Sequence, residues 1–376
     1  MNKLFEPFDF SDLHFTSRVV MAPMTRCRSS QPGNVPNNLM AEYYGQRTSA
    51  ALIISEATQV SQHGQGYSFT PGIHSQEQLS GWKKITARVH QNGGQIVCQL
   101  WHVGRMSHSM FQNGDSPVAP SAISVPAGTS VWVHDGKEGK MVPCTPPRAL
   151  SLNEISGIQD DFVNAAKNAK AAGFDGIEIH GANGYLIDEF LRTTSNQRTD
   201  QYGGSPENRI RFLIGLIENL RDVYPAHRTG VRFSPHNTSR GMNDPQAPDT
   251  VLKAIRQLND MGIGYIHFAE ADWDEAPEIP VDFRLEARRT FSGLIIVAGK
   301  YEKARAEKIL NERLADLVAF GRPFVANPDL PVRMKNNLSF AELKPDLLYG
   351  GDALGYTDYP SWSPNARRKS AVCERG

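Results

Sequence analysis

Residues 151–180, SLNEISGIQDDFVNAAKNAKAAGFDGIEIH, contain one complete helix–strand unit and decide the fold class. Ser151 and Glu154 have the spacing of a helix capping box, and the apolar residues after them recur every three or four positions. The unit ends in GIEIH at 176–180, a run typical of a strand that is buried on both faces. Strands of this kind pair in parallel, and parallel sheets need helices on their faces.

The same alternation of strand and helix continues along the chain. Short β-branched runs recur, and stretches with helical periodicity separate them. These units predict an α/β fold, a single closed (β/α)8 TIM barrel. They disfavour a doubly wound sheet, because the GxGxxG turn of such sheets is absent from the sequence. The eight strands are expected at 18–22, 51–56, 95–100, 176–180, 230–233, 265–268, 293–298 and 316–320.

A long insertion follows the third predicted strand. A barrel needs about 250 residues, so a chain of 376 residues leaves room for insertions. Residues 103–150 show no helical stripe and contain six prolines. Long loops of this kind commonly act as lids or binding loops, although a surface excursion with a small hairpin around Val131–Val133 fits the same pattern. We expect one domain over residues 1–376, with 103–150 as an excursion that caps the barrel.

Composition and charge exclude several classes of function. Forty Lys plus Arg balance forty Asp plus Glu, which argues against nucleic acid or an anionic membrane as the partner. No apolar run approaches the roughly 20 residues that cross a bilayer, and the first residues do not resemble a signal peptide. We therefore expect a cytoplasmic protein. The four cysteines lie far apart, so we expect neither a disulfide framework nor a metal site.

Polar residues follow several predicted strands, at the face where barrel enzymes perform their chemistry. Arg232 interrupts an apolar strand and needs an anionic partner there. Gly299 and Gly321 follow the last two strands, where barrels bind phosphate through backbone N–H groups, and Arg322 adds a guanidinium suited to phosphate. The site therefore predicts an elongated ligand with a phosphate at one end and a delocalised anion at the other.

Four segments identify a family: MAPMTR at 21–26, HGANGYLIDEFL at 180–191, NQRTDQYGGSPENR at 196–209 and FGRPFVANPDLP at 320–331. With them the chain resembles the Old Yellow Enzyme family of FMN-dependent ene-reductases. The resemblance implies a TIM barrel that binds FMN, uses NADPH or NADH as the reductant and works by a ping-pong mechanism as an NADPH dehydrogenase. It also implies small electrophilic alkenes as substrates, chiefly α,β-unsaturated carbonyls, with nitro-olefins and nitrate esters as further candidates.

The resemblance implies a role for each matching residue at the cofactor. Thr25 would bond the flavin carbonyl near N5, the Gln99 amide would pair with the pyrimidine edge, and Arg232 would face the N1 region. Many family members have Gly-Gly after the seventh strand, whereas this chain has Gly299-Lys300, so either the backbone or the side chain of Lys300 would reach the phosphate. The full set of expected FMN contacts is Pro23, Met24, Thr25, Ala57, Gln99, His180, Arg232, Gly299, Lys300, Gly321 and Arg322.

The resemblance also implies the catalytic residues. His180 and Asn183 would donate hydrogen bonds to the substrate carbonyl oxygen, so that hydride from flavin N5 reaches the β-carbon. Tyr185 would give its phenolic proton to the α-carbon on the opposite face. Trp101 and Tyr356 would line the substrate cavity.

Two other functions fit part of this pattern. A non-flavin barrel enzyme, such as an aldolase or isomerase, would place a sugar phosphate on the same loops. A catalytically silent flavin-binding barrel would share the fold, because a fold does not fix a function. Bound FMN distinguishes the first alternative, and re-oxidation of the reduced flavin by an enone distinguishes the second.

Overall fold

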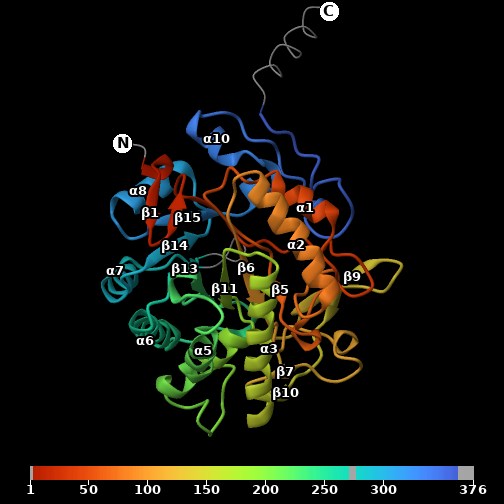
Figure 1. Ribbon diagram of the computed structural model, residues 1–376. Helices are drawn as coiled ribbons and strands as arrows, with labels where there is room; N and C mark the ends of the chain where they lie inside the picture. Colours follow the sequence, from red (N-terminus) through yellow and green to blue (C-terminus); the bar gives the residue numbers. More distant parts are fainter. Residues whose placement is uncertain (1–2, 271–276, 363–376) are drawn as a thin grey trace, which may run out of the picture.

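A computed structural model describes residues 3–270 and 277–362 of the chain, and its centre is a closed barrel of eight parallel strands (Figure 1). Each strand pairs with the next one around the barrel, and pairing of the last strand with the first closes it. This is the (β/α)8 TIM barrel that the sequence predicted. The barrel strands are β3 (Val19–Met21), β4 (Leu52–Ile54), β6 (Ile96–Trp101), β11 (Gly176–Gly181), β12 (Thr229–Phe233), β13 (Tyr265–Ala269), β14 (Leu294–Ala298) and β15 (Leu317–Phe320).

Helices surround the barrel (Figure 1). The capping box predicted for the fourth unit is present, because the Ser151 side chain accepts from the Glu154 N–H and the Glu154 carboxylate accepts from the Ser151 N–H. The α-helices are α1 (Asn38–Gly45), α2 (Gln76–Gln91), α3 (Leu152–Ala171), α4 (Leu186–Leu191), α5 (Pro206–Leu220), α6 (Ala247–Asp260), α7 (Val281–Thr290), α8 (Lys303–Asn311), α9 (Arg322–Ala326) and α10 (Leu330–Lys335). Short 3-10 turns lie at Lys3–Phe5, Gln62–Gly64, Ser109–Phe111, Ala226–Arg228, Ser239–Gly241 and Pro345–Leu347.

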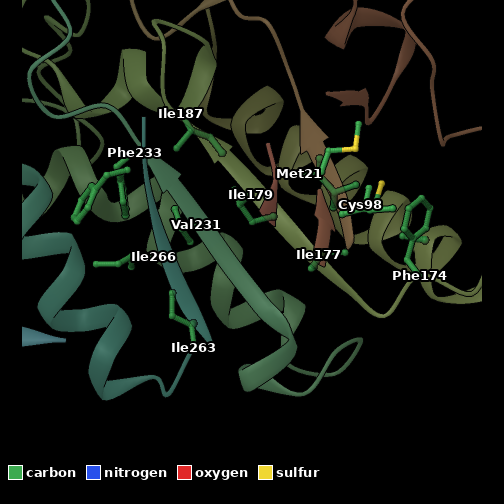
Figure 2. Close-up of a cluster of buried hydrophobic side chains, with 14 of the residues drawn as sticks. Met21, Cys98, Phe174, Ile177, Ile179, Ile187, Val231, Phe233, Ile263 and Ile266 are labelled. Atoms are coloured by element: carbon green, nitrogen blue, oxygen red, sulfur yellow. The ribbon is translucent and has the colours of Figure 1, made fainter. Parts of the chain in front are cut away.

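The main hydrophobic core lies between the strands and the helices. Ile177 and Ile179 of β11 belong to one buried cluster with apolar residues of α3 and α5, and Val231 and Phe233 of β12 join it (Figure 2). Successive side chains of a strand point to opposite faces. The residues between these apolar ones, such as Arg232, therefore point into the barrel, and this alternation supplies the floor of the site.

A hairpin that the sequence did not suggest closes the amino end of the barrel. Strands β1 (Phe8–Phe10) and β2 (Leu13–Phe15) pair antiparallel. Their apolar side chains pack against residues at the starts of the barrel strands, including Val20 and Leu317. Because the amino end is filled in this way, the open end of the barrel interior is the carboxyl end.

The segment between β6 and α3 forms the long excursion. It contains the hairpin expected around Val131–Val133, in which Trp132 pairs with Met141. Its strands are β7 (Val118–Ala119), β8 (Ser130–His134), β9 (Gly139–Pro143) and β10 (Arg148–Ala149), and the two-residue β5 (Thr58–Gln59) pairs with β6 nearby. Over residues 3–270 and 277–362, no helix is long and apolar enough to traverse a lipid bilayer.

Candidate active site

A cavity of about 520 Å³ opens at the carboxyl ends of the barrel strands. This volume is within the range of cofactor and substrate pockets. Residues from the ends of six strands line it, because the carboxyl ends of parallel strands converge at one face. The sequence-predicted residues among its lining are Pro23, Met24, Thr25, Ala57, Gln99, Trp101, His180, Asn183, Tyr185, Arg232, Gly299, Lys300, Gly321 and Arg322.

His180 lies on the cavity wall as a neutral imidazole. Burial, together with the positive charges of Arg232 and Arg240, holds the pKa of His180 well below its usual range. The Ala182 N–H donates to Nδ1 of the ring at 3.3 Å. Because Nδ1 accepts, the single ring proton is on Nε2. His180 can therefore donate one hydrogen bond to a ligand without being charged.

The loop after β11 turns sharply and is held from behind. Asn183 and Gly184 both have left-handed backbones, with φ of 60° and 76°, conformations that these two residue types tolerate. The Asn183 N–H donates to Ser234 Oγ at 2.7 Å, and the Gly184 N–H donates to Asp188 at 2.9 Å. Asp188 in turn forms a buried ion pair with Arg192. This network fixes the loop that carries Asn183 and directly follows the β11 residues His180 and Gly181.

Tyr185 is clamped among aromatic rings. Only 8% of Tyr185 is exposed, and its ring meets Trp101 edge-on with centroids 4.9 Å apart. The Arg240 guanidinium lies 5.1 Å from the centre of the Tyr185 ring. The Tyr185 hydroxyl lies 3.3 Å from the Tyr67 hydroxyl, so the two phenols form a hydrogen-bonded pair. The phenolic group therefore has one defined direction in the cavity.

Several cavity residues were not found from the sequence, and four of them are Tyr67, Trp132, Arg240 and Tyr349. All four lie on connecting segments or on the excursion hairpin rather than at the ends of barrel strands. A signal for Tyr67 exists in the preceding Gly66, where a Cβ atom would lie 2.1 Å from the Met106 carbonyl oxygen. Such a close backbone approach indicates a glycine that places its neighbours.

The expected substrate contact at Tyr356 is corrected by the structure. Tyr356 is fully buried and does not line the cavity. Its ring stacks on Tyr43 with centroids 4.1 Å apart, and the Arg28 guanidinium lies 4.5 Å from the ring centre. Tyr349, seven residues earlier, lines the cavity instead. These contacts with Tyr43 and Arg28 hold the Tyr356 ring in the protein interior and not at the cavity.

Two strand-end loops form the other end of the cavity. Gly299 and Lys300 have φ of 148° and 49°, so Lys300 occupies a left-handed position that favours glycine. Arg305 braces this loop, because it donates to the Gly299 carbonyl at 2.8 Å and to the Glu270 carboxylate at 3.1 Å. Glu270 also accepts from Arg284 and from the Tyr301 hydroxyl. The loop after β14 is therefore held from behind by one buried carboxylate.

Comparison with known proteins decides the family. The model of the NADH:flavin oxidoreductase / NADH oxidase family matches residues 3–340. The chain belongs to this family. It is 41% identical to 12-oxophytodienoate reductase 1 of Oryza sativa subsp. japonica over 365 residues, which is 95% of this chain and 92% of that protein. As a family member it is an oxidoreductase that uses FMN and a nicotinamide nucleotide.

Solved structures of the family share its fold closely. Morphinone reductase in complex with tetrahydroNAD is 43% identical, with a TM-score of 0.91 over 96% of this chain and 98% of that one. The Old Yellow Enzyme homologue from Zymomonas mobilis is 40% identical, with a TM-score of 0.89 over 95% of this chain and 99% of that one. The resemblance drawn from the sequence motifs is thus confirmed.

The donor set of the cavity fits the family's cofactor. Gln99 offers both an amide donor and an acceptor, as a pyrimidine edge requires, and Arg232 supplies a positive charge on the same floor. At the opposite end lie the Gly299 and Gly321 loops, with the cations Lys300 and Arg322. The cavity therefore offers groups suited to a polar ring system at one end and to a phosphate at the other, which fits the two ends of FMN.

The brace at the phosphate end gives a first prediction. Arg305→Lys keeps the positive charge but cannot join the Gly299 carbonyl to Glu270. We expect the dissociation constant of FMN to rise about tenfold, as for one lost charge-assisted hydrogen bond. Riboflavin, which lacks the phosphate, should bind with an unchanged constant. Fluorescence titration of the apo-protein with each flavin measures both constants, and equal weakening of the two would contradict a role at the phosphate.

Proposed function

We propose that this chain is an ene-reductase that uses FMN and NADPH to reduce the activated C=C bond of α,β-unsaturated carbonyls by a ping-pong mechanism. Nitro-olefins and nitrate esters are further candidate substrates. One observation carries the proposal: His180, Asn183 and Tyr185 face one cavity, and His180 is a neutral donor whose Nδ1 is already occupied. The related proteins are named as reductases of morphinone and 12-oxophytodienoate, which supports the same class of reaction.

The lining residues divide between the two ends of the cofactor. When bound, FMN supplies the hydride that is added to the β-carbon of the alkene. Its ring system would contact Pro23, Met24, Thr25, Ala57, Gln99, His180 and Arg232, and its phosphate would contact Gly299, Lys300, Gly321 and Arg322.

His180, at the end of β11, and residues of the loop that follows would act on the substrate. Negative charge develops on the substrate carbonyl oxygen as the C=C bond is reduced. His180 Nε2–H and the Asn183 amide would donate hydrogen bonds to that oxygen and stabilise the charge. Tyr185 would then donate its phenolic proton to the α-carbon. Trp101 and Tyr349 would shape the space around the alkene, since both line the cavity.

The excursion at 103–150 would cap the cavity in which the reaction takes place. It would belong to a single domain that spans residues 1–376. Trp132 and Met141 of its hairpin line the cavity. The Trp132 carbonyl accepts from the Ser68 N–H at 3.1 Å, which ties the hairpin to the loop that carries Tyr67. A covered cavity excludes water, and hydrogen bonds to a developing charge are stronger there than in bulk water.

Purification and turnover test the proposed function. We expect one FMN for each chain, and oxidation of one NADPH for each 2-cyclohexenone reduced. Initial rates at several enone concentrations should give parallel double-reciprocal lines, as a ping-pong mechanism requires. A colourless protein that cannot take up FMN would favour the aldolase or isomerase alternative. A flavoprotein that NADPH reduces, but that no enone, maleimide or nitro-olefin re-oxidises, would instead be a silent flavin-binding barrel.

A further inference from the structure

The cavity floor contains a buried carboxylate to which the proposed reaction gives no role. Glu178 lies on β11 between Ile177 and Ile179, so it points into the barrel, and its exposed fraction is 0%. One of its oxygens accepts from Gln99 Nε2 at 2.7 Å. The other lies 2.9 Å from His267 Nδ1 on β13. Glu178 therefore connects β6, β11 and β13 directly beneath the cavity.

Each of these hydrogen bonds to Glu178 fixes the orientation of its partner, Gln99 or His267. A carboxylate only accepts, so Gln99 must turn its NH2 group toward Glu178 and keep its amide oxygen for another partner. For the same reason His267 donates its Nδ1–H. Burial lowers the pKa of His267, so its ring is neutral and the pair carries the negative charge of Glu178 alone.

The cavity floor consequently holds two opposite charges. Burial raises the pKa of Glu178, but His267, Arg232 and Gln99 outweigh it and leave this pKa below its usual range. The carboxyl is therefore ionised at neutral pH. Arg232 of β12 stands beside His180 on one neighbouring strand and beside His267 on the other. A buried charge without compensation is costly, so Glu178 and Arg232 compensate each other.

We propose that Glu178 is a positioning residue for the bound flavin: it orients the Gln99 amide and offsets the charge of Arg232, two cavity residues that would hold the flavin ring system. This inference rests on the proposed function. Reduced flavin carries negative charge near N1, so a nearby carboxylate disfavours it and a nearby guanidinium favours it. Glu178 thus lowers the midpoint potential of the flavin relative to a floor that contains Arg232 alone.

Glu178→Gln tests the electrostatic part, because it removes the charge and keeps the shape. Its amide oxygen still accepts from one of the two partners, and the other partner, Gln99 or His267, must turn an acceptor toward the new NH2 group. We expect the ratio of the dissociation constants of oxidised and reduced FMN to rise about tenfold, which raises the midpoint potential by about 30 mV for a two-electron couple. Spectroelectrochemical titration against a reference dye measures this shift. A structural disturbance of the floor would weaken binding of both flavin states without moving their ratio.

Two further variants control the experiment. His267→Gln keeps Glu178 charged and offers it an amide donor, so the potential should stay at the wild-type value. Arg232→Gln should lower the potential, and Glu178→Gln combined with Arg232→Gln should restore it toward wild type. Removal of two opposite buried charges is better tolerated than removal of one, so the double variant gives a result even if Glu178→Gln alone does not fold.

The outcomes separate this inference from the proposed function. A wild-type protein that does not bind FMN would refute the proposed function. A wild-type protein that binds FMN, together with a Glu178→Gln variant of unchanged potential, would overturn the inference alone. Equal potentials for Arg232→Gln and the double variant would overturn it in the same way.

Discussion

Tyr185→Phe is expected to slow re-oxidation of the pre-reduced enzyme by 2-cyclohexenone by about 10²–10⁴-fold, the usual scale of lost general acid catalysis. The substitution keeps the ring that packs edge-on against Trp101 and deletes only the hydroxyl. A phenol is a weak acid. It suffices here because His180 and Asn183 would already hold the substrate as a delocalised enolate. Single-turnover stopped-flow absorbance measures the rate directly.

Reduction of the flavin by NADPH serves as the internal control for Tyr185→Phe. That half-reaction needs no proton at carbon, so its rate should stay near the wild-type value. Quinones and nitro compounds, which also need none, should re-oxidise the variant with much smaller losses. A re-oxidation rate by cyclohexenone within about threefold of wild type would show that water or another side chain supplies the proton.

Tyr67→Phe is the matched variant for the neighbouring phenol. The Tyr67 hydroxyl lies 3.3 Å from that of Tyr185. Its removal leaves Tyr185, the proposed proton donor, in place but takes away one hydrogen-bond partner of that residue. We expect a loss of about tenfold or less, the value of one neutral hydrogen bond. If Tyr67→Phe showed the large loss and Tyr185→Phe the small one, the assignment of the donor would have to be exchanged between the two.

The barrel was predictable because a strand that is buried on both faces consists almost entirely of apolar residues, and such runs can be recognised in the sequence. Runs such as 293–298 are apolar at every position, which only a strand covered by helices requires. The hairpin of β1 and β2 was missed because Asp9 and His14 interrupt its two short strands, so neither forms the continuous apolar run by which the barrel strands were recognised. Its Phe8 and Phe10 are recognisable as a plug only once the barrel end that they fill is known.

The strand-end residues of the site were predictable for a topological reason: parallel strands bring their carboxyl ends together wherever they lie in the sequence. Loop residues lack such a constraint. Tyr349 and Tyr356 lie in one irregular segment, and only its packing against Arg28 and Tyr43 determines which ring faces the cavity. Glu178 was not recognised from the sequence, because its proposed role depends on its contacts with Gln99 and with His267, which lies two strands away in the barrel.

Replacement of both His180 and Asn183 by Ala is expected to weaken binding of a phenol to the oxidised enzyme by about 2–4 kcal/mol, or about 30- to 1,000-fold in the dissociation constant. A phenol places its oxygen where the enolate oxygen of the substrate would lie. The double variant lacks both side-chain donors that face this position, in a cavity where His180 is 4% and Asn183 is 5% exposed. The charge-transfer band over the flavin gives the constant by titration. His74→Ala removes a histidine that does not line the cavity and should leave the constant unchanged.

The state of His180 makes the same experiment sensitive to pH. Its pKa is lowered well below the ordinary 6.5 by burial and by the charges of Arg232 and Arg240. The imidazole is therefore neutral above that lowered pKa, with Nδ1 accepting from Ala182 and Nε2–H free to donate. Affinity for the protonated phenol should accordingly stay constant as the pH falls from about 8 through about 6.5. A change with a midpoint near 6.5 would mean that His180 titrates normally and binds as an imidazolium. Wild-type affinity in the double variant would remove both residues from the oxygen site.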